Sequence, residues 1–118
     1  MRDHTKLRAF EAADQLAMVV YRMTAAFPPS ERFELSSQMR RAAVSIPSNI
    51  VEGCARHTEQ EYVRYLDIAY GSSRELQYQA SLAARLGFIA APNYAILAKA
   101  CEETAKLLNA LINSYRRK

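Results

Sequence analysis

Apolar residues recur every three to four positions along most of the chain, a spacing that is typical of amphipathic α-helices. The few glycines and prolines fall largely where other helix-boundary signals occur. These breaks predict four helices, at about Ala9–Phe27, Ser36–Arg56, from just after His57 to Leu86, and Pro92–Tyr115. Because the sequence contains no strand pattern, repeat or linker, we expect residues 1–118 to form one domain.

The first and fourth predicted helices carry more apolar positions than one helix contact requires. The first has two neighbouring stripes, and in the fourth Ile96, Ala100 and Leu107 flank a main stripe that repeats every 3.5 residues. Surplus apolar surface on a helical bundle often marks self-association, so this pattern favours a homo-oligomer. The alternative is a bundle whose own helices cover these positions.

The second predicted helix contains ten uncharged residues, AAVSIPSNIV, from Ala42 to Val51. A helix without charge over nearly three turns is expected to be enclosed on most sides. Pro47 lies inside this stretch and removes a backbone hydrogen bond, so we expect a kink there. A second interpretation is that Pro47 divides two helices, although the apolar spacing continues across it.

The third predicted helix begins at a capping box formed by Thr58 and Glu61, and Gly87 is suited to follow its end. Gly71 lies in its middle, where glycine costs about 1 kcal/mol relative to alanine. We therefore predict that the backbone of the second helix comes close to Gly71 through its small residues AAVS. The fold class predicted is all-α: an antiparallel up-down four-helix bundle, with the second helix kinked at Pro47.

Composition agrees with a globular domain. The chain has 118 residues and a mass of 13.3 kDa, and its 50% hydrophobic and 24% charged residues exclude a disordered sequence. The longest apolar run, Ala17 to Tyr21, is much shorter than the roughly 20 residues of a membrane helix. The first residues, MRDHTKLR, lack an apolar signal core, so a cytoplasmic location is expected.

The residues needed for catalysis or metal binding are sparse. Cys54 and Cys101 lie on apolar stripes and are interpreted as reduced, buried thiols. Only His4 and His57 could join them as metal ligands, and no second ligand pair has suitable spacing. A set of Cys54, His57 and Glu61 would span the predicted break between helices. We therefore expect no catalytic site, no metal and no cofactor.

Charge points to an anionic partner. Lysine and arginine total 16 against 12 acidic residues, for a net charge of +4, and twelve of the sixteen are arginine, whose planar group matches phosphate. Tyrosines interleave with arginines along the third helix, an arrangement that can stack bases and hold phosphates. Each observation has an alternative explanation. The net charge can serve solubility, the tyrosines can pack in the core, and the basic C-terminal residues can interact with the dipole of the fourth helix. The candidate nucleic-acid contacts are Arg40, Arg41, Arg56, His57, Arg64, Arg74, Arg116, Arg117 and Lys118.

Two long segments carry a family resemblance. QMRRAAVSIPSNIVEG, from Gln38 to Gly53, resembles the signature of the four-helix-bundle proteins encoded in intervening sequences of bacterial 23S ribosomal RNA genes. The similarity continues in EQEYVRYLDIAYGSSRELQYQ, from Glu59 to Gln79, and in LGFI, from Leu86 to Ile89. The first helix is a looser match, with Phe10 where the family often has tryptophan.

The resemblance implies a function that the residues alone do not give. The family is related to accessory proteins of diversity-generating retroelements, which form five-membered barrels, bind nucleic acid and associate with a reverse transcriptase. It therefore implies a homo-oligomer, a pentamer, with a basic surface for RNA or DNA and a reverse-transcriptase or ribosomal partner. It supplies no catalytic residue. The alternative from another class is a protein-protein adaptor bundle without a nucleic-acid role.

Overall fold

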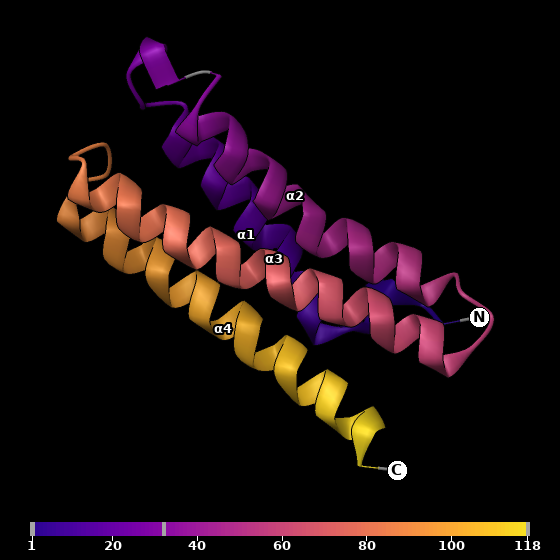
Figure 1. The fold of residues 1–118 in the computed structure, drawn as a ribbon. Helices are drawn as coiled ribbons and strands as arrows, with labels where there is room; N and C mark the ends of the chain where they lie inside the picture. Colours follow the sequence, from indigo (N-terminus) through magenta and orange to yellow (C-terminus); the bar gives the residue numbers. More distant parts are fainter. Residues whose placement is uncertain (1, 32, 118) are drawn as a thin grey trace.

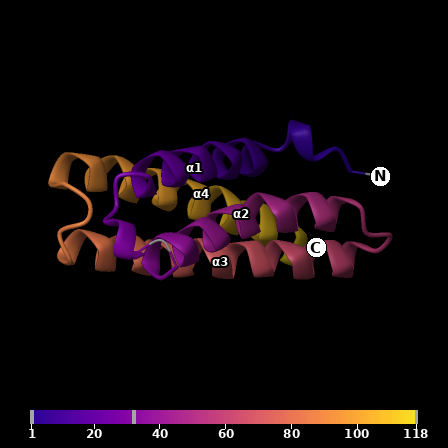
Figure 2. The same cartoon turned by 90° about the horizontal axis from the view of Figure 1, so that it is seen from above.

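The computed structural model describes residues 2–31 and 33–117 and folds them into a helical bundle (Figure 1). Its long helices are α1 (Arg8–Thr24), α2 (Leu35–Cys54), α3 (Glu59–Arg85) and α4 (Ala91–Arg116). Two 3-10 turns, His4–Lys6 and Pro29–Glu31, precede α1 and α2. Each helix packs against the next, and α4 packs against α1, within extents of 45 × 23 × 19 Å (Figures 1 and 2). The all-α, up-down four-helix bundle predicted from the sequence is confirmed.

All four helices contribute buried side chains to one core, and those of α2 and α3 follow a regular spacing. On α2 the fully buried positions are Met39, Ala43, Ile46 and Ile50. On α3 the apolar spacing predicts one inward stripe, and all seven of its residues are buried: Tyr62, Leu66, Ala69, Ser73, Leu76, Ala80 and Ala83. The strict three-four spacing of these positions therefore selects the face of each helix that enters the core.

Helix α1 ends at Thr24, three residues before the predicted end at Phe27. Phe27 precedes Pro28, whose ring disfavours helical backbone at the preceding residue. The last N–H groups, of Ala26 and Phe27, instead donate to the carbonyls three residues back. The Phe27 ring is buried, with its centroid 5.5 Å from that of Phe88. The side chain therefore belongs to the core although its backbone has left the helix.

Helix α2 continues through Pro47 without a break, so the interpretation as two helices is wrong. Asn49 stabilises this stretch, because its Nδ2 donates to the Ser45 carbonyl at 2.8 Å and to Ser45 Oγ at 3.0 Å. Ser45 Oγ also shares a hydrogen bond of 2.8 Å with Ser72 Oγ on α3. Short polar side chains thus join the two helices beside the proline.

The predicted close approach at Gly71 is wrong. Gly71 is exposed, and a Cβ built there would meet no other residue within 4 Å. The glycine at a close approach is Gly53 on α2, where a Cβ would lie 2.9 Å from Tyr65 Cβ and 3.3 Å from Tyr62 Cδ1. The small-residue stretch of α2 does pack on α3, through Ser45 and Ser72, but Gly71 faces away from that contact.

Helices α3 and α4 begin and end close to the predicted positions. Thr58 Oγ1 accepts a hydrogen bond from the Glu61 N–H, as the capping box requires, and Gly87 has φ of +82° after the end of α3. The main apolar stripe predicted for the fourth helix runs through Leu97, Cys101, Thr104, Leu108 and Leu111, but near the end of α4 the buried residue is Ile112 rather than Leu111. A straight helix has 3.6 residues per turn, so the 3.5-residue stripe drifts out of the core by one position.

Candidate nucleic-acid interface

The corner between α2 and α3 brings three of the predicted contact residues together. Arg56 and His57 lie in the short connection, and Arg64 lies on the second turn of α3. Tyr65 lies beside both arginines: its ring centroid is 5.5 Å from Arg56 Cζ and 4.9 Å from Arg64 Cζ. Arg56 Nε also donates to the Glu52 carbonyl at 3.3 Å, at the end of α2. The Tyr65 ring thus holds both guanidinium groups near it, and the end of α2 also holds that of Arg56.

Gly53 explains why Tyr65 can take this position. Because Gly53 has no side chain, α3 approaches α2 until Tyr65 Cβ occupies the space that a Cβ of residue 53 would need. Tyr65 is therefore half-buried against α2 while its ring reaches the arginines. Tyr65 is one of the tyrosines that interleave with arginines along the predicted third helix, whereas no sequence prediction concerned Gly53. A glycine within the last turn of a predicted helix was the available signal.

No described carboxylate forms an ion pair with Arg56 or Arg64. His57 is exposed beside them. The end of the bundle is nevertheless mixed in charge, because Glu59, Glu61 and Asp67 line a groove there together with Arg64. The corner can therefore offer two unpaired guanidinium groups to an anion, within surroundings that also contain carboxylates.

Both ends of the described chain lie at this end of the bundle (Figures 1 and 2). Arg2 Cζ lies 4.2 Å from the ring centroid of buried Tyr62, whose pKa burial raises above its ordinary value. Arg116 pairs with Asp67 on α3, and Arg117 is exposed. Arg116 therefore has a structural partner, whereas Lys118 lies outside the described residues.

Arg40 and Arg41 lie elsewhere on α2, about 20 Å before its end at Cys54 at 1.5 Å per residue. Arg40 Nε donates to Thr24 Oγ1 at 2.8 Å, and its Nη2 donates to the Tyr21 carbonyl at 3.3 Å. Its Cζ lies 4.6 Å from the Tyr21 ring centroid, so Arg40 joins α2 to the end of α1. Arg41 is exposed there, and Arg74 is exposed halfway along α3. The predicted basic residues thus occupy separate places on the bundle.

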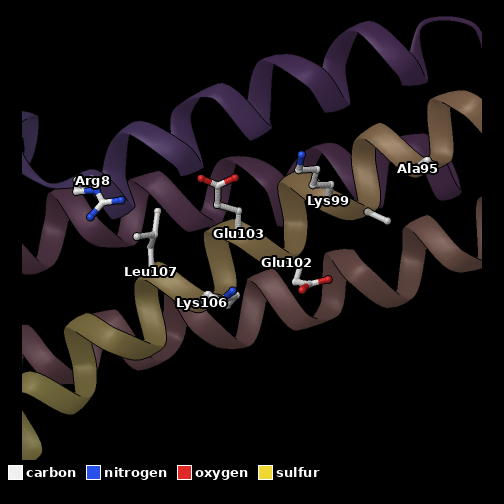
Figure 3. Close-up of a pocket in the computed structure, with 8 residues that line it drawn as sticks. Arg8, Ala95, Lys99, Glu102, Glu103, Lys106 and Leu107 are labelled. Atoms are coloured by element: carbon white, nitrogen blue, oxygen red, sulfur yellow. The ribbon is translucent and has the colours of Figure 1, made fainter.

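A groove of about 590 Å³ lies along α4, near the start of α1 (Figure 3). Arg8 borders it from the start of α1, while Ala95, Ala98 and Leu107 on α4 supply apolar lining. Its other lining residues are charged and of both signs: Lys99, Glu102, Glu103 and Lys106. A surface with both charges does not favour a polyanion, and none of the predicted contact residues lies there.

The thiols are poorly suited to nucleophilic chemistry. Cys54 and Cys101 are both free and buried, as predicted. Burial raises the pKa of both, that of Cys101 to about 12, so each thiol stays protonated near neutral pH. Within the described ranges, no group of histidine, cysteine and carboxylate side chains is arranged to hold a metal ion. No described helix is long and apolar enough to span a membrane.

Comparisons with known proteins give the family. A solved structure similar to this one is that of a protein of unknown function from the S23 ribosomal protein family of Bacteroides thetaiotaomicron. It has a TM-score of 0.82 and 23% identity, over 88% of this chain and 97% of that chain, a likeness that supports the fold. No curated protein matches the sequence. The model of the 23S rRNA-intervening sequence protein family matches residues 5–110, and this chain therefore belongs to that family.

Proposed function

We propose that this protein is a non-enzymatic, self-associating helical bundle that binds RNA or DNA through phosphate contacts at the α2–α3 corner. In this proposal it assembles as a pentamer, the number that the family resemblance implies. The assembled bundle then acts as a scaffold in a ribonucleoprotein or reverse-transcriptase complex.

The observation that carries the nucleic-acid part is the pair of arginines beside Tyr65. Arg56 and Arg64 lie against one ring, and no described carboxylate neutralises them. The ring already restricts these two side chains, so they lose little further conformational freedom when they contact phosphate oxygens. In a ring of identical copies the corner would recur in each copy, which multiplies a weak single contact.

Exposed apolar side chains support self-association. Four of them lie on α1 and α2: Met18, Tyr21, Val44 and Val51. Three more lie on α3 or directly after it: Ile68, Tyr78 and Leu86. A monomer would leave both groups in water, whereas contact between copies would bury them.

The test is a filter-binding titration with structured RNA and with duplex DNA at about 50 mM salt, where phosphate contacts are strong. We expect retention of at least one of the two nucleic acids. Light scattering on the same sample measures the mass, for which we expect a multiple of 13.3 kDa. Absence of retention for both ligands would contradict the nucleic-acid part, and a monomeric mass would contradict the oligomer.

A protein-protein adaptor is the second candidate, and the mixed charge at the end of the bundle favours it. Glu59, Glu61 and Asp67 lie in the groove beside Arg64, where they would repel a polyanion. This candidate predicts an oligomeric mass together with no retention of either nucleic acid. The two measurements above therefore separate the candidates.

A further inference from the structure

We propose that the outer side of α4, near the end of the helix, binds the minor groove of double-stranded RNA. The inference rests on the proposed function, because it names the nucleic acid and adds a second contact to that of the α2–α3 corner. We define the α4 outer row by the six residues that line one hollow of about 360 Å³: Lys106, Asn109, Ala110, Asn113, Ser114 and Arg117.

The α4 outer row lies opposite the buried side of its helix. The buried residues of this half of α4 are Ala105, Leu108 and Ile112, and the row occupies positions on the far side of the helical repeat. Helix α4 packs against α3 and α1, and in Figure 1 its second half forms an edge of the bundle. The row is therefore open to a ligand, while two other helices flank the helix that carries it.

The α4 outer row carries positive charge and no negative charge. Lys106 and Arg117 lie at its two ends, about 16 Å apart along the helix at 1.5 Å per residue. The sequence from Thr104 onward contains no aspartate or glutamate, and neither cation pairs with a described carboxylate. Glu102 and Glu103 lie on the preceding turn, as Figure 3 shows, so they confine an anion to the last part of the helix.

Two amides lie between the cations. Asn109 and Asn113 are four residues apart, and neither side chain forms a hydrogen bond with another described residue. Ser114 differs, because its Oγ donates to the Leu111 carbonyl at 2.6 Å. Each amide offers two N–H donors and one oxygen acceptor, so it can bond a hydroxyl group in either direction. Along the helix the row therefore presents a cation, two unpaired amides and a second cation, with the small side chain of Ala110 leaving room between them.

This order of groups fits the minor groove of an RNA duplex. That groove is wide and shallow, and it displays 2′-hydroxyl groups between the phosphates of the two strands. In the proposed contact Lys106 and Arg117 bind phosphates at the two edges of the groove. The amides of Asn109 and Asn113 bond 2′-hydroxyl groups between those edges. Because DNA lacks the 2′-hydroxyl group, the two amides favour RNA over DNA.

The packing of α4 also disfavours duplex DNA. The minor groove of B-DNA is about 6 Å wide, which is too narrow for a helix, and its major groove is about 8.5 Å deep. A helix that reads bases in the major groove has to enter it, whereas α4 has α1 and α3 at its sides. A shallow groove requires contact with the outer row alone. Double-stranded RNA therefore suits both the chemistry and the accessibility of this surface.

The experiment compares an RNA duplex with a DNA duplex of the same sequence, each of about 16 base pairs, a length that double-stranded-RNA-binding domains cover. Binding is followed by fluorescence anisotropy, and the full chain should bind the RNA more tightly. Replacing Asn109 and Asn113 together by alanine should weaken RNA binding roughly tenfold and leave DNA binding unchanged. Asn93→Ala removes an exposed amide from the first turn of the same helix and is the matched control, which should change neither affinity.

The cations are tested through the salt dependence. Replacing Lys106 and Arg117 together by alanine should reduce the slope of log RNA affinity against log salt by about 2. Replacing exposed Arg41 and Arg74 removes the same charge elsewhere and should leave this slope unchanged. Circular dichroism checks that each variant remains helical.

Failure of this inference and failure of the proposed function give different results. A wild-type chain that binds neither duplex would contradict both. A chain that loses RNA affinity on replacement of Arg56 and Arg64, but not on replacement of the row residues, would retain the corner site and overturn the contact at α4. Equal wild-type affinity for RNA and DNA would also overturn it, as would an equal loss of both affinities when the two amides are removed.

Discussion

The two glycines inside long helices should respond in opposite ways to the same substitution. At Gly53 an alanine Cβ would lie 2.9 Å from Tyr65 Cβ and 3.3 Å from both Cδ1 and the carbonyl oxygen of Tyr62. Carbon atoms pack best at about 3.5–4.0 Å, so α2 and α3 must separate by roughly 0.6 Å or more. At Gly71 the new Cβ would meet nothing within 4 Å.

The magnitudes follow from two opposing contributions. Gly→Ala gains about 1 kcal/mol of stability in a helix interior, as at Gly71, and at most that at Gly53, which lies in the last turn of α2. Overpacking costs about 1–3 kcal/mol, so Gly53→Ala should lower the free energy of unfolding by about 1 kcal/mol overall. Gly71→Ala should raise it by about 1 kcal/mol in the monomer. For a chain of this length 1 kcal/mol corresponds to a shift in Tm of about 4 °C.

The assay is thermal unfolding followed by circular dichroism, at a protein concentration where the chain is monomeric. Gly71→Ala is the control for the intrinsic effect of alanine, and the two variants should differ in Tm by about 8 °C. If Gly53→Ala melts at or above the wild-type temperature, the close approach of α2 and α3 that places Tyr65 is refuted.

Three further results are expected. Arg40→Ala should lower the free energy of unfolding by about 1–2 kcal/mol, measured in urea, because Thr24 loses a hydrogen-bond partner. The matched control Arg41→Ala, at an exposed position, should change this free energy little. Equal effects of the two substitutions would contradict this role of Arg40. Burial raises the pKa of Cys101 from 9.0 to about 12, so the unfolded chain loses the thiol proton first and stability should fall as the pH rises through this range. In urea unfolding at the same pH values, the free energy of unfolding of the Cys101→Ala variant should fall less steeply than that of the wild type. Parallel pH curves for the two proteins would argue against a buried thiol. Tyr65→Leu should weaken RNA retention roughly two- to fivefold through lost cation–π contacts while Tyr65→Phe should not, and equal retention by all three proteins would show that the ring does not position the arginines.

The fold could be predicted because local signals and apolar spacing agree. Local signals predict three helix ends to within about a residue or two: the Thr58 cap before α3, Gly87 after α3 and Pro92 in the first turn of α4. The α3 stripe is buried throughout. The predicted end of α1 at Phe27 was wrong. The apolar spacing continues to Phe27, but Pro28 disfavours helical backbone there and the helix ends at Thr24.

The candidate site could be predicted only in part, because neighbouring helices decide what each arginine touches. Arg40 and Arg56 look alike in the sequence, yet Arg40 binds the end of α1 while Arg56 lies against Tyr65. The glycines show the same limit. Gly53 and Gly71 both lie within predicted helices, but only Gly53 has a close neighbour, because the side of a helix that meets the next helix depends on rotation about the helix axis.

The salt dependence of RNA affinity tests the central claim most directly. Each phosphate contact contributes about −0.9 to the slope of log affinity against log salt for a duplex, so replacing both Arg56 and Arg64 by alanine should reduce the slope by about 2. Replacing exposed Arg41 and Arg74 removes the same charge at other places and should leave the slope near the wild-type value. A slope that is unchanged in the first variant, or reduced equally in both, would contradict a phosphate site at the α2–α3 corner.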